Sequence, residues 1–204
     1  MNTLEYILNK YKVEGKGLIK LHCTRWGTLP KLFKDLGFTV GAEIGVAKGR
    51  FAKLLCEGNP NLRLYGIDVW KVYDGYQDTD GTEQKIMDDI YRDARARLAP
   101  FKVEIVNEWS MDAVKRFEDE SLDFVYIDCN HAYEYAKEDI REWSKKVRKG
   151  GIVSGHDYIN GHAGIAFGVI QAVNEWVEEN NIPYLFILNK DANINQMPSW
   201  MYVK

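Results

Sequence analysis

Apolar and polar positions follow two alternating patterns along this chain. Short apolar, β-branched runs predict five buried strands, at 38–44, 62–67, 103–106, 122–127 and 151–154. Between these runs apolar residues recur at helical spacing, as Ala136, Ile140 and Trp143 do. Regular alternation of strands and helices predicts βαβ units and a mostly parallel sheet with helices on both faces.

The two ends of the chain depart from this alternation. The segments 183–188 ("PYLFIL") and 199–204 ("SWMYVK") are joined by a polar loop without a helical pattern, so they predict an antiparallel hairpin. Residues 1–36 predict a helical segment ahead of the first strand. We therefore expect an α/β fold with a seven-stranded, mostly parallel sheet and a C-terminal antiparallel hairpin.

Length and composition narrow the class of protein. The 204 residues, 46% of them hydrophobic, suffice for one α/β domain but not for two, so we expect a single domain over 1–204. Lys and Arg are scattered and the net charge is -3, which disfavours nucleic acid as a partner. The chain lacks both a secretory signal pattern and an apolar run near the ~18 residues of a bilayer span. Three widely spaced cysteines favour free thiols, and we expect a cytoplasmic protein without a membrane partner.

The stretch "AEIGVAKGRFAKLL" (42–55) marks a turn from the first predicted strand into a helix. Gly45 can adopt a positive φ and let a ligand approach the backbone, and Gly49 lets the helix start close to the strand. The same glycines would also serve a compact turn that binds nothing. Glu43 precedes the turn, where its carboxylate would repel a diphosphate but suit the cationic S-adenosylmethionine.

Polar groups follow every predicted strand, and in an open parallel sheet ligands bind outside the carboxyl ends of the strands. Asp68 follows the second strand, where a carboxylate can accept hydrogen bonds from both ribose hydroxyls. Trp109, after the third strand, could lie against an adenine ring or pack in the core below it. Asp68 together with the glycine turn favours a nucleotide site over a turn without a ligand.

The fourth and fifth strands are followed by two Asp–His pairs. His131 and His156 are candidate general bases because imidazole accepts protons near neutral pH, although either ring could instead be a structural hydrogen-bonding group. Asp128 and Asp157 are hard oxygen donors that could share a Mg²⁺, or they could simply cap helices. We expect these four side chains to converge on one point, with Asp157 taking part in catalysis.

Four stretches together resemble a known family: "EIGVAKGRFAKLL", "GIDVW", "DFVYIDCNHAYEYAKEDIREWSKKV" and "RKGGIVSGHDY". They are similar to class I S-adenosylmethionine-dependent methyltransferases, and most similar to the type-24 group related to sugar and antibiotic O-methyltransferases, over residues 40–158. The resemblance implies a Rossmann-like methyltransferase fold, in which Trp109 and Ser110 flank adenine. It allows a metal at Asp128 and Asp157, as related sugar O-methyltransferases carry one there. Cys129 departs from the pattern, which usually has glycine after that Asp. The expected cofactor-binding set is Glu43, Gly45, Val46, Gly49, Asp68, Val69, Trp109, Ser110 and Asp128.

The expected activity is S-adenosylmethionine-dependent O-methylation of a small hydroxylated acceptor, such as a sugar or polyol. Mg²⁺ is an optional cofactor in this expectation, and whether the chain forms a homodimer stays open. The segment 70–81, with three aromatics and three aspartates, predicts a lid over the substrate or a packed surface loop. Two alternatives stay open. The spacing Tyr133-x-x-x-Lys137 matches NAD(P)-dependent short-chain reductases, and the chain could also be a catalytically inactive nucleotide-binding protein.

Overall fold

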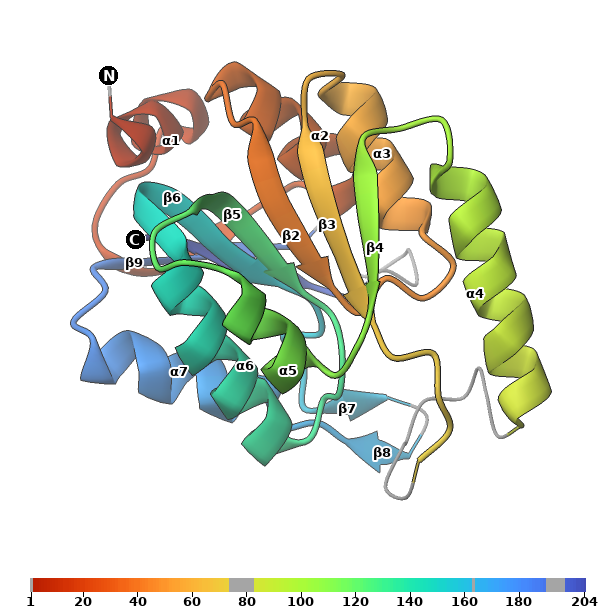
Figure 1. Ribbon diagram of the computed structural model, residues 1–204. Helices are drawn as coiled ribbons and strands as arrows, with labels where there is room; N and C mark the ends of the chain where they lie inside the picture. The colour runs from red at the N-terminus through yellow and green to blue at the C-terminus, as the bar shows by residue number, and fades with distance from the viewer. Residues whose placement is uncertain (1, 74–82, 163, 190–196) are drawn as a thin grey trace.

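The computed structural model describes residues 2–73, 83–162, 164–189 and 197–204 (Figure 1). Its main sheet has eight strands in the order β1-β9-β10-β6-β5-β2-β3-β4. Every neighbouring pair is parallel except the two that involve β10. The eight strands are β1 (Gly17–Leu21), β2 (Val40–Ile44), β3 (Arg63–Asp68), β4 (Val103–Asn107), β5 (Leu122–Ile127), β6 (Val147–Gly155), β9 (Tyr184–Leu188) and β10 (Ser199–Val203).

Helices cover both faces of this sheet, as the sequence predicts. One core packs the apolar faces of four helices against the sheet: α1 (Thr3–Tyr11), α2 (Arg25–Asp35), α3 (Arg50–Gly58) and α4 (Gln84–Leu98). A second core on the opposite face takes side chains from α5 (Ser110–Ala113), η1 (Val114–Arg116), α6 (Tyr133–Lys146) and α7 (Val169–Glu179). The fully buried Trp143 and Phe33 belong to α6 and α2, one on each face.

The predicted fold is confirmed in class and in its antiparallel hairpin, but the expectation of seven strands is wrong by one. The additional strand, β1, lies inside the segment 1–36 and pairs in parallel with β9 at the edge of the sheet. A five-residue edge strand whose first four residues are not buried has no apolar run to predict it, because its pairing depends on β9, more than 160 residues later. The helical prediction for 1–36 holds for α1 and α2 only.

The register of the central strands aligns their carboxyl ends. Ile44 of β2 pairs with Ile67 of β3 and with Ile127 of β5, which in turn pairs with Gly155 of β6. The turns after these strands therefore open at one edge of the sheet, the lower edge in Figure 1. The short hairpin of β7 (Gly161–His162) and β8 (Ile165–Ala166) lies beside that edge. In the described part of the chain no helix has the length and apolarity that crossing a membrane requires.

Candidate active site

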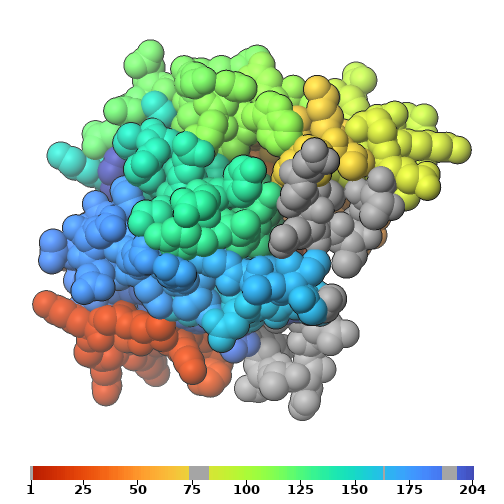
Figure 2. All heavy atoms as spheres, turned by 90° about the horizontal axis from the view of Figure 1, so that it is seen from below, coloured from red at the N-terminus to blue at the C-terminus, as the bar shows by residue number. Residues whose placement is uncertain are grey.

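A cavity of about 260 Å³ lies at the carboxyl ends of β2, β3, β4 and β5. Figure 2 views the molecule from this end, where α5 (green), α6 (teal) and the hairpin region (blue) lie side by side. Seven of the residues predicted for the site line the cavity: Gly45, Asp68, Val69, Trp109, Ser110, Asp128 and His131. Other predicted residues, among them Glu43 and Asp157, are buried and do not line the cavity.

The glycine turn after β2 needs glycine for steric reasons. Gly45 has φ +89°, and a Cβ there would lie 1.9 Å from the backbone oxygen of Asp128. Gly49 has φ +69° at the start of α3, and a Cβ there would lie 3.0 Å from Leu98. A turn that packs this tightly leaves its backbone open to the cavity at Gly45, so the compact turn and the ligand site are compatible.

Asp68 fastens the glycine turn to the segment that follows β3. Its Oδ2 accepts a hydrogen bond from Ala47 N at 2.8 Å, and its Oδ1 accepts one from Trp70 N at 3.0 Å. Burial raises the pKa of this carboxyl, although the backbone N–H groups around it act in the opposite direction. The carboxylate therefore holds the cavity wall in shape in addition to facing the cavity.

Glu43 lies beneath the turn rather than in the cavity. Its side chain is 2% exposed, and burial, with the negative charge of Asp128 nearby, raises its pKa well above the usual range. One carboxyl oxygen, Oε2, is buried without a hydrogen-bond partner. Contact between Glu43 and a cationic ligand thus stays a prediction.

The wall formed by α5 and α6 contains a polar network that the sequence analysis missed. Trp109 lines the cavity with 42% of its surface exposed, so it is not a core aromatic. Behind it the Ser110 hydroxyl donates to Asp139 Oδ1 and accepts a 2.8 Å hydrogen bond from Trp143 Nε1. Cys129 Sγ donates to Asp139 Oδ2 at 2.7 Å. Burial raises the pKa of Asp139, which is 4% exposed, to about 6.

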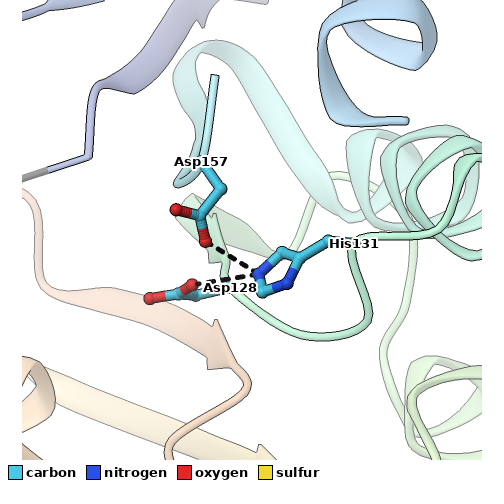
Figure 3. Close-up of side chains that lie close together, drawn as sticks. All are labelled: Asp128, His131 and Asp157. Atoms are coloured by element: carbon cyan, nitrogen blue, oxygen red, sulfur yellow. Dashed lines mark ion pairs between the residues drawn. The ribbon is translucent and has the colours of Figure 1, made fainter. Parts of the chain in front are cut away.

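The two Asp–His pairs meet at the carboxyl ends of β5 and β6. His131 Nε2 lies 2.8 Å from Asp157 Oδ2 and 3.9 Å from Asp128 Oδ1, between the two carboxylates (Figure 3). His156 Nδ1 lies 3.1 Å from Asp157 Oδ2 and 3.4 Å from Asp128 Oδ1. Asp157 adopts a left-handed backbone, φ 53°, which is uncommon for a residue other than glycine and is typical of functional sites. The structure thus brings the four predicted side chains together.

Electrostatics in this cluster favour charged side chains. Burial lowers the pKa of both imidazoles, but the two carboxylates raise it by more than burial lowers it. The resulting pKa is about 10 for His131 and about 9 for His156. The histidines in turn hold the pKa of Asp128 and Asp157 below the usual range despite burial. The two carboxylates therefore favour the protonated form of both rings. A general base, or a metal ligand, must first lose that proton, so the role of either histidine as a base stays a prediction.

Three of these side chains have the chemistry of a metal site. One ligand atom from each of Asp128, His131 and Asp157 lies within 4.8 Å of the others. His131 Nε2 is buried without a hydrogen bond of good geometry, although it faces two carboxylates. An imidazole nitrogen and two carboxylate oxygens suit a divalent cation. The predicted pair Asp128 and Asp157 is therefore joined by a third donor, His131.

Arg25 is a second residue that the sequence analysis missed. Its Nη1 donates to Asp128 Oδ2 and to Tyr126 Oη, each at 2.7 Å. The residue opens α2, far from the predicted strand ends in sequence, and a single arginine at a helix start carries no motif. Only the packing of α2 against β5 reveals it.

Of the remaining predicted motifs, the Tyr133–Lys137 pair does not line the cavity, whereas Lys71 and Tyr73 of the predicted lid do. Tyr133 and Lys137 bind each other at 2.7 Å, and both contact Glu175 of α7, so this pair joins α6 to α7. Of the predicted lid, Trp70 is buried and packs against Tyr91. Tyr73 reaches Asn130 across the cavity wall through a 3.0 Å hydrogen bond. The rest of the lid, 74–81, lies outside the described residues.

Comparisons with known proteins identify the family and the fold. A family model described as a methyltransferase domain matches residues 42–158. An O-methyltransferase from Bacillus cereus, solved in complex with SAH, is 16% identical with a TM-score of 0.64, covering 99% of this chain and 90% of its own. TomG of Streptomyces achromogenes, an O-methyltransferase of tomaymycin synthesis solved with SAM, is 17% identical with a TM-score of 0.61, covering 88% and 79%. No curated protein matches the sequence.

Proposed function

The chain belongs to the methyltransferase-domain family, which its residues 42–158 match, and we propose that it transfers a methyl group from S-adenosylmethionine to a hydroxyl oxygen of a small acceptor such as a sugar or polyol. The observation that carries the proposal is the cavity at the carboxyl ends of β2 to β5, where the turn at Gly45, the carboxylate of Asp68 and the ring of Trp109 face one space. The fold is that of class I methyltransferases, and two structural neighbours were solved with SAH or SAM.

In this proposal the cavity is divided along its length. Asp68 accepts hydrogen bonds from the ribose hydroxyls, because its carboxylate lines the cavity at the end of β3. The adenine ring lies toward Trp109 and Ser110, on the side of β4 and α5. The methyl group then points toward Asp128 and His131, on the side of β5.

Asp128, His131 and Asp157 would hold a divalent cation at that end of the cavity. Mg²⁺ prefers oxygen ligands alone, whereas a set that includes imidazole also suits Mn²⁺ and other transition ions. When bound, such an ion supplies Lewis-acid polarisation of the acceptor hydroxyl. His156 lies against Asp157 and fixes its carboxylate, and the protein contributes mainly by positioning the acceptor oxygen in line with the methyl carbon.

The mouth of the cavity supports a hydroxylated acceptor. Asn130 supplies a polar group there, and the exposed ring of Tyr135 offers a surface against which a sugar ring can stack. Phe167 lies 4.4 Å from the His131 ring and closes the opposite side. We keep a cytoplasmic location and the absence of nucleic-acid partners as predictions, and the homodimer stays open.

Methyl transfer to a panel of hydroxylated acceptors tests the proposal. The purified chain is incubated with S-adenosylmethionine, Mn²⁺ or Mg²⁺ and each acceptor, and S-adenosylhomocysteine is quantified by mass spectrometry. We expect acceptor-dependent product with at least one sugar or polyol, formed at least tenfold more slowly by Asp157→Ala. S-adenosylhomocysteine binding without turnover on any acceptor would support a nucleotide-binding protein instead, and product formation only on thiols or amines would contradict O-methylation.

A further inference from the structure

We infer that Arg25 is a positioning residue for the active site, holding one oxygen of Asp128 so that the other faces the histidines. The inference rests on the proposed function, because it assigns the consequence to the proposed cation site. It also extends the site beyond residues 42–158, the part of the chain that the family model matches. The segment before β2 then contributes to the chemistry instead of only covering the sheet.

The Arg25 side chain is held from several directions. It is 12% exposed, and its guanidinium carbon lies 4.6 Å from the Trp26 ring centroid and 5.1 Å from that of Phe51. Its Nη1 is shared between Asp128 Oδ2 and Tyr126 Oη. Tyr126 is itself fully buried and its hydroxyl lies 3.0 Å from Ser199 Oγ of β10. The guanidinium is thus fixed by aromatic faces and by a hydrogen-bonded chain to the neighbouring sheet strands.

This arrangement assigns different roles to the two oxygens of Asp128. Oδ2 accepts the charged hydrogen bond from Arg25. Oδ1 is the oxygen that lies 3.4 Å from His156 and 3.9 Å from His131. Because Arg25 fixes Oδ2, rotation of the carboxylate away from the histidines would break a short hydrogen bond in a nearly dry environment. Groups of this kind, which orient a metal ligand, typically change metal affinity 10- to 100-fold when they are replaced.

A second arginine–aspartate pair, at the opposite end of β5, offers a matched control. Arg148 Nε donates to Asp123 Oδ1 at 2.7 Å, and its guanidinium carbon lies 5.3 Å from the Phe38 ring centroid. Asp123 stands near the start of β5, whereas Asp128 follows its end. The Arg148 side chain is more exposed, at 42%, but this pair repeats the chemistry of Arg25 and Asp128 at the amino-terminal ends of the central strands. A general effect of losing an arginine–aspartate pair should therefore appear in both variants.

The experiment compares R25K with R148K in the full chain. A lysine keeps the charge but loses the planar guanidinium that the Trp26 and Phe51 rings hold in place. We expect R25K to lower Mn²⁺ affinity, measured by electron paramagnetic resonance, at least tenfold, while R148K leaves it unchanged and both retain S-adenosylhomocysteine binding. Unchanged Mn²⁺ affinity in R25K, or an equal loss in both variants, would overturn the inference. If R25K does not fold, Y126F removes one anchor of Arg25 and should give a smaller loss in the same direction, and no loss in Y126F would count equally against the inference.

A second readout separates this inference from the proposed function. If the parent chain binds no Mn²⁺, the cation site fails, and the NMR resonances of the His131 and His156 side chains at one fixed pH become the test. These resonances should shift in R25K and stay in place in R148K, because only Arg25 sets the orientation of Asp128. Shifts in neither variant, or in both alike, would overturn the inference.

Discussion

Replacing Asp139 by asparagine should stabilise the protein in a pH-dependent way. Burial raises the pKa of Asp139 from 3.8 to about 6, and the Cys129 thiol and the Ser110 hydroxyl donate to its carboxylate. The folded state binds the Asp139 proton more tightly than the unfolded state does. The stability that this carboxyl contributes is therefore fully present below pH ~4 and is lost as the pH rises through ~6. The folded-state and unfolded-state pKa values differ by about 2.2. At 1.36 kcal/mol per pKa unit, this difference lowers the free energy of unfolding by about 3 kcal/mol above pH ~7.

The assay is urea unfolding of the parent chain and Asp139→Asn at pH 5 and pH 7.5. Since part of the cost is already present at pH 5, the advantage of the variant should grow by roughly 1 kcal/mol between the two values. Asparagine keeps an oxygen for Ser110 and removes the titration. The control Glu134→Gln changes an exposed carboxylate on the same helix and should show no such growth. An advantage of Asp139→Asn that is equal at both pH values would refute the reasoning.

Three further predictions concern the site. Asp68→Ala should weaken S-adenosylhomocysteine binding by roughly 1.5 to 3 kcal/mol in calorimetry, because charge-assisted hydrogen bonds to ribose are lost; unchanged affinity would place ribose elsewhere. Asp157→Ala should abolish Mn²⁺ binding and lower turnover at least tenfold, about 1.4 kcal/mol in the barrier, with S-adenosylhomocysteine affinity retained; a chelator that leaves the parent's turnover intact would argue against the cation. Tyr133→Phe should leave turnover unchanged, because this hydroxyl binds Glu175 and Lys137; NADH oxidation that disappears in this variant would revive the reductase alternative.

The sequence predicted the parts of the fold that follow from local pattern. Apolar runs located the central strands, and the strand-end rule brought Asp68, Asp128 and His131 to one cavity. It could not predict β1, whose pairing with β9 depends on contacts between distant segments. Arg25 was missed for the same reason, since its role arises only when α2 packs beside the end of β5.

The sequence predicted which residues gather at the site better than it predicted how each side chain points. Glu43 stands beside the glycine turn in sequence, but alternation along β2 turns its side chain into the interior. Asp139 gave a signal that could have been used, because it interrupts the apolar face formed by Ala136 and Ile140 on α6. A lone acid on a buried helix face needs a partner, and here the partners are Ser110 and Cys129.

Calorimetric titration of the purified chain with S-adenosylhomocysteine, and separately with NAD, tests the central claim most directly. The account predicts saturable one-to-one binding of S-adenosylhomocysteine, weakened at least tenfold in Asp68→Ala, and no binding of NAD. It predicts this because Asp68 and the turn at Gly45 face one cavity, and because the spacing Gly45-x-x-x-Gly49 lacks the G-x-G-x-x-G pattern typical of a diphosphate site. Tighter binding of NAD than of S-adenosylhomocysteine would contradict it.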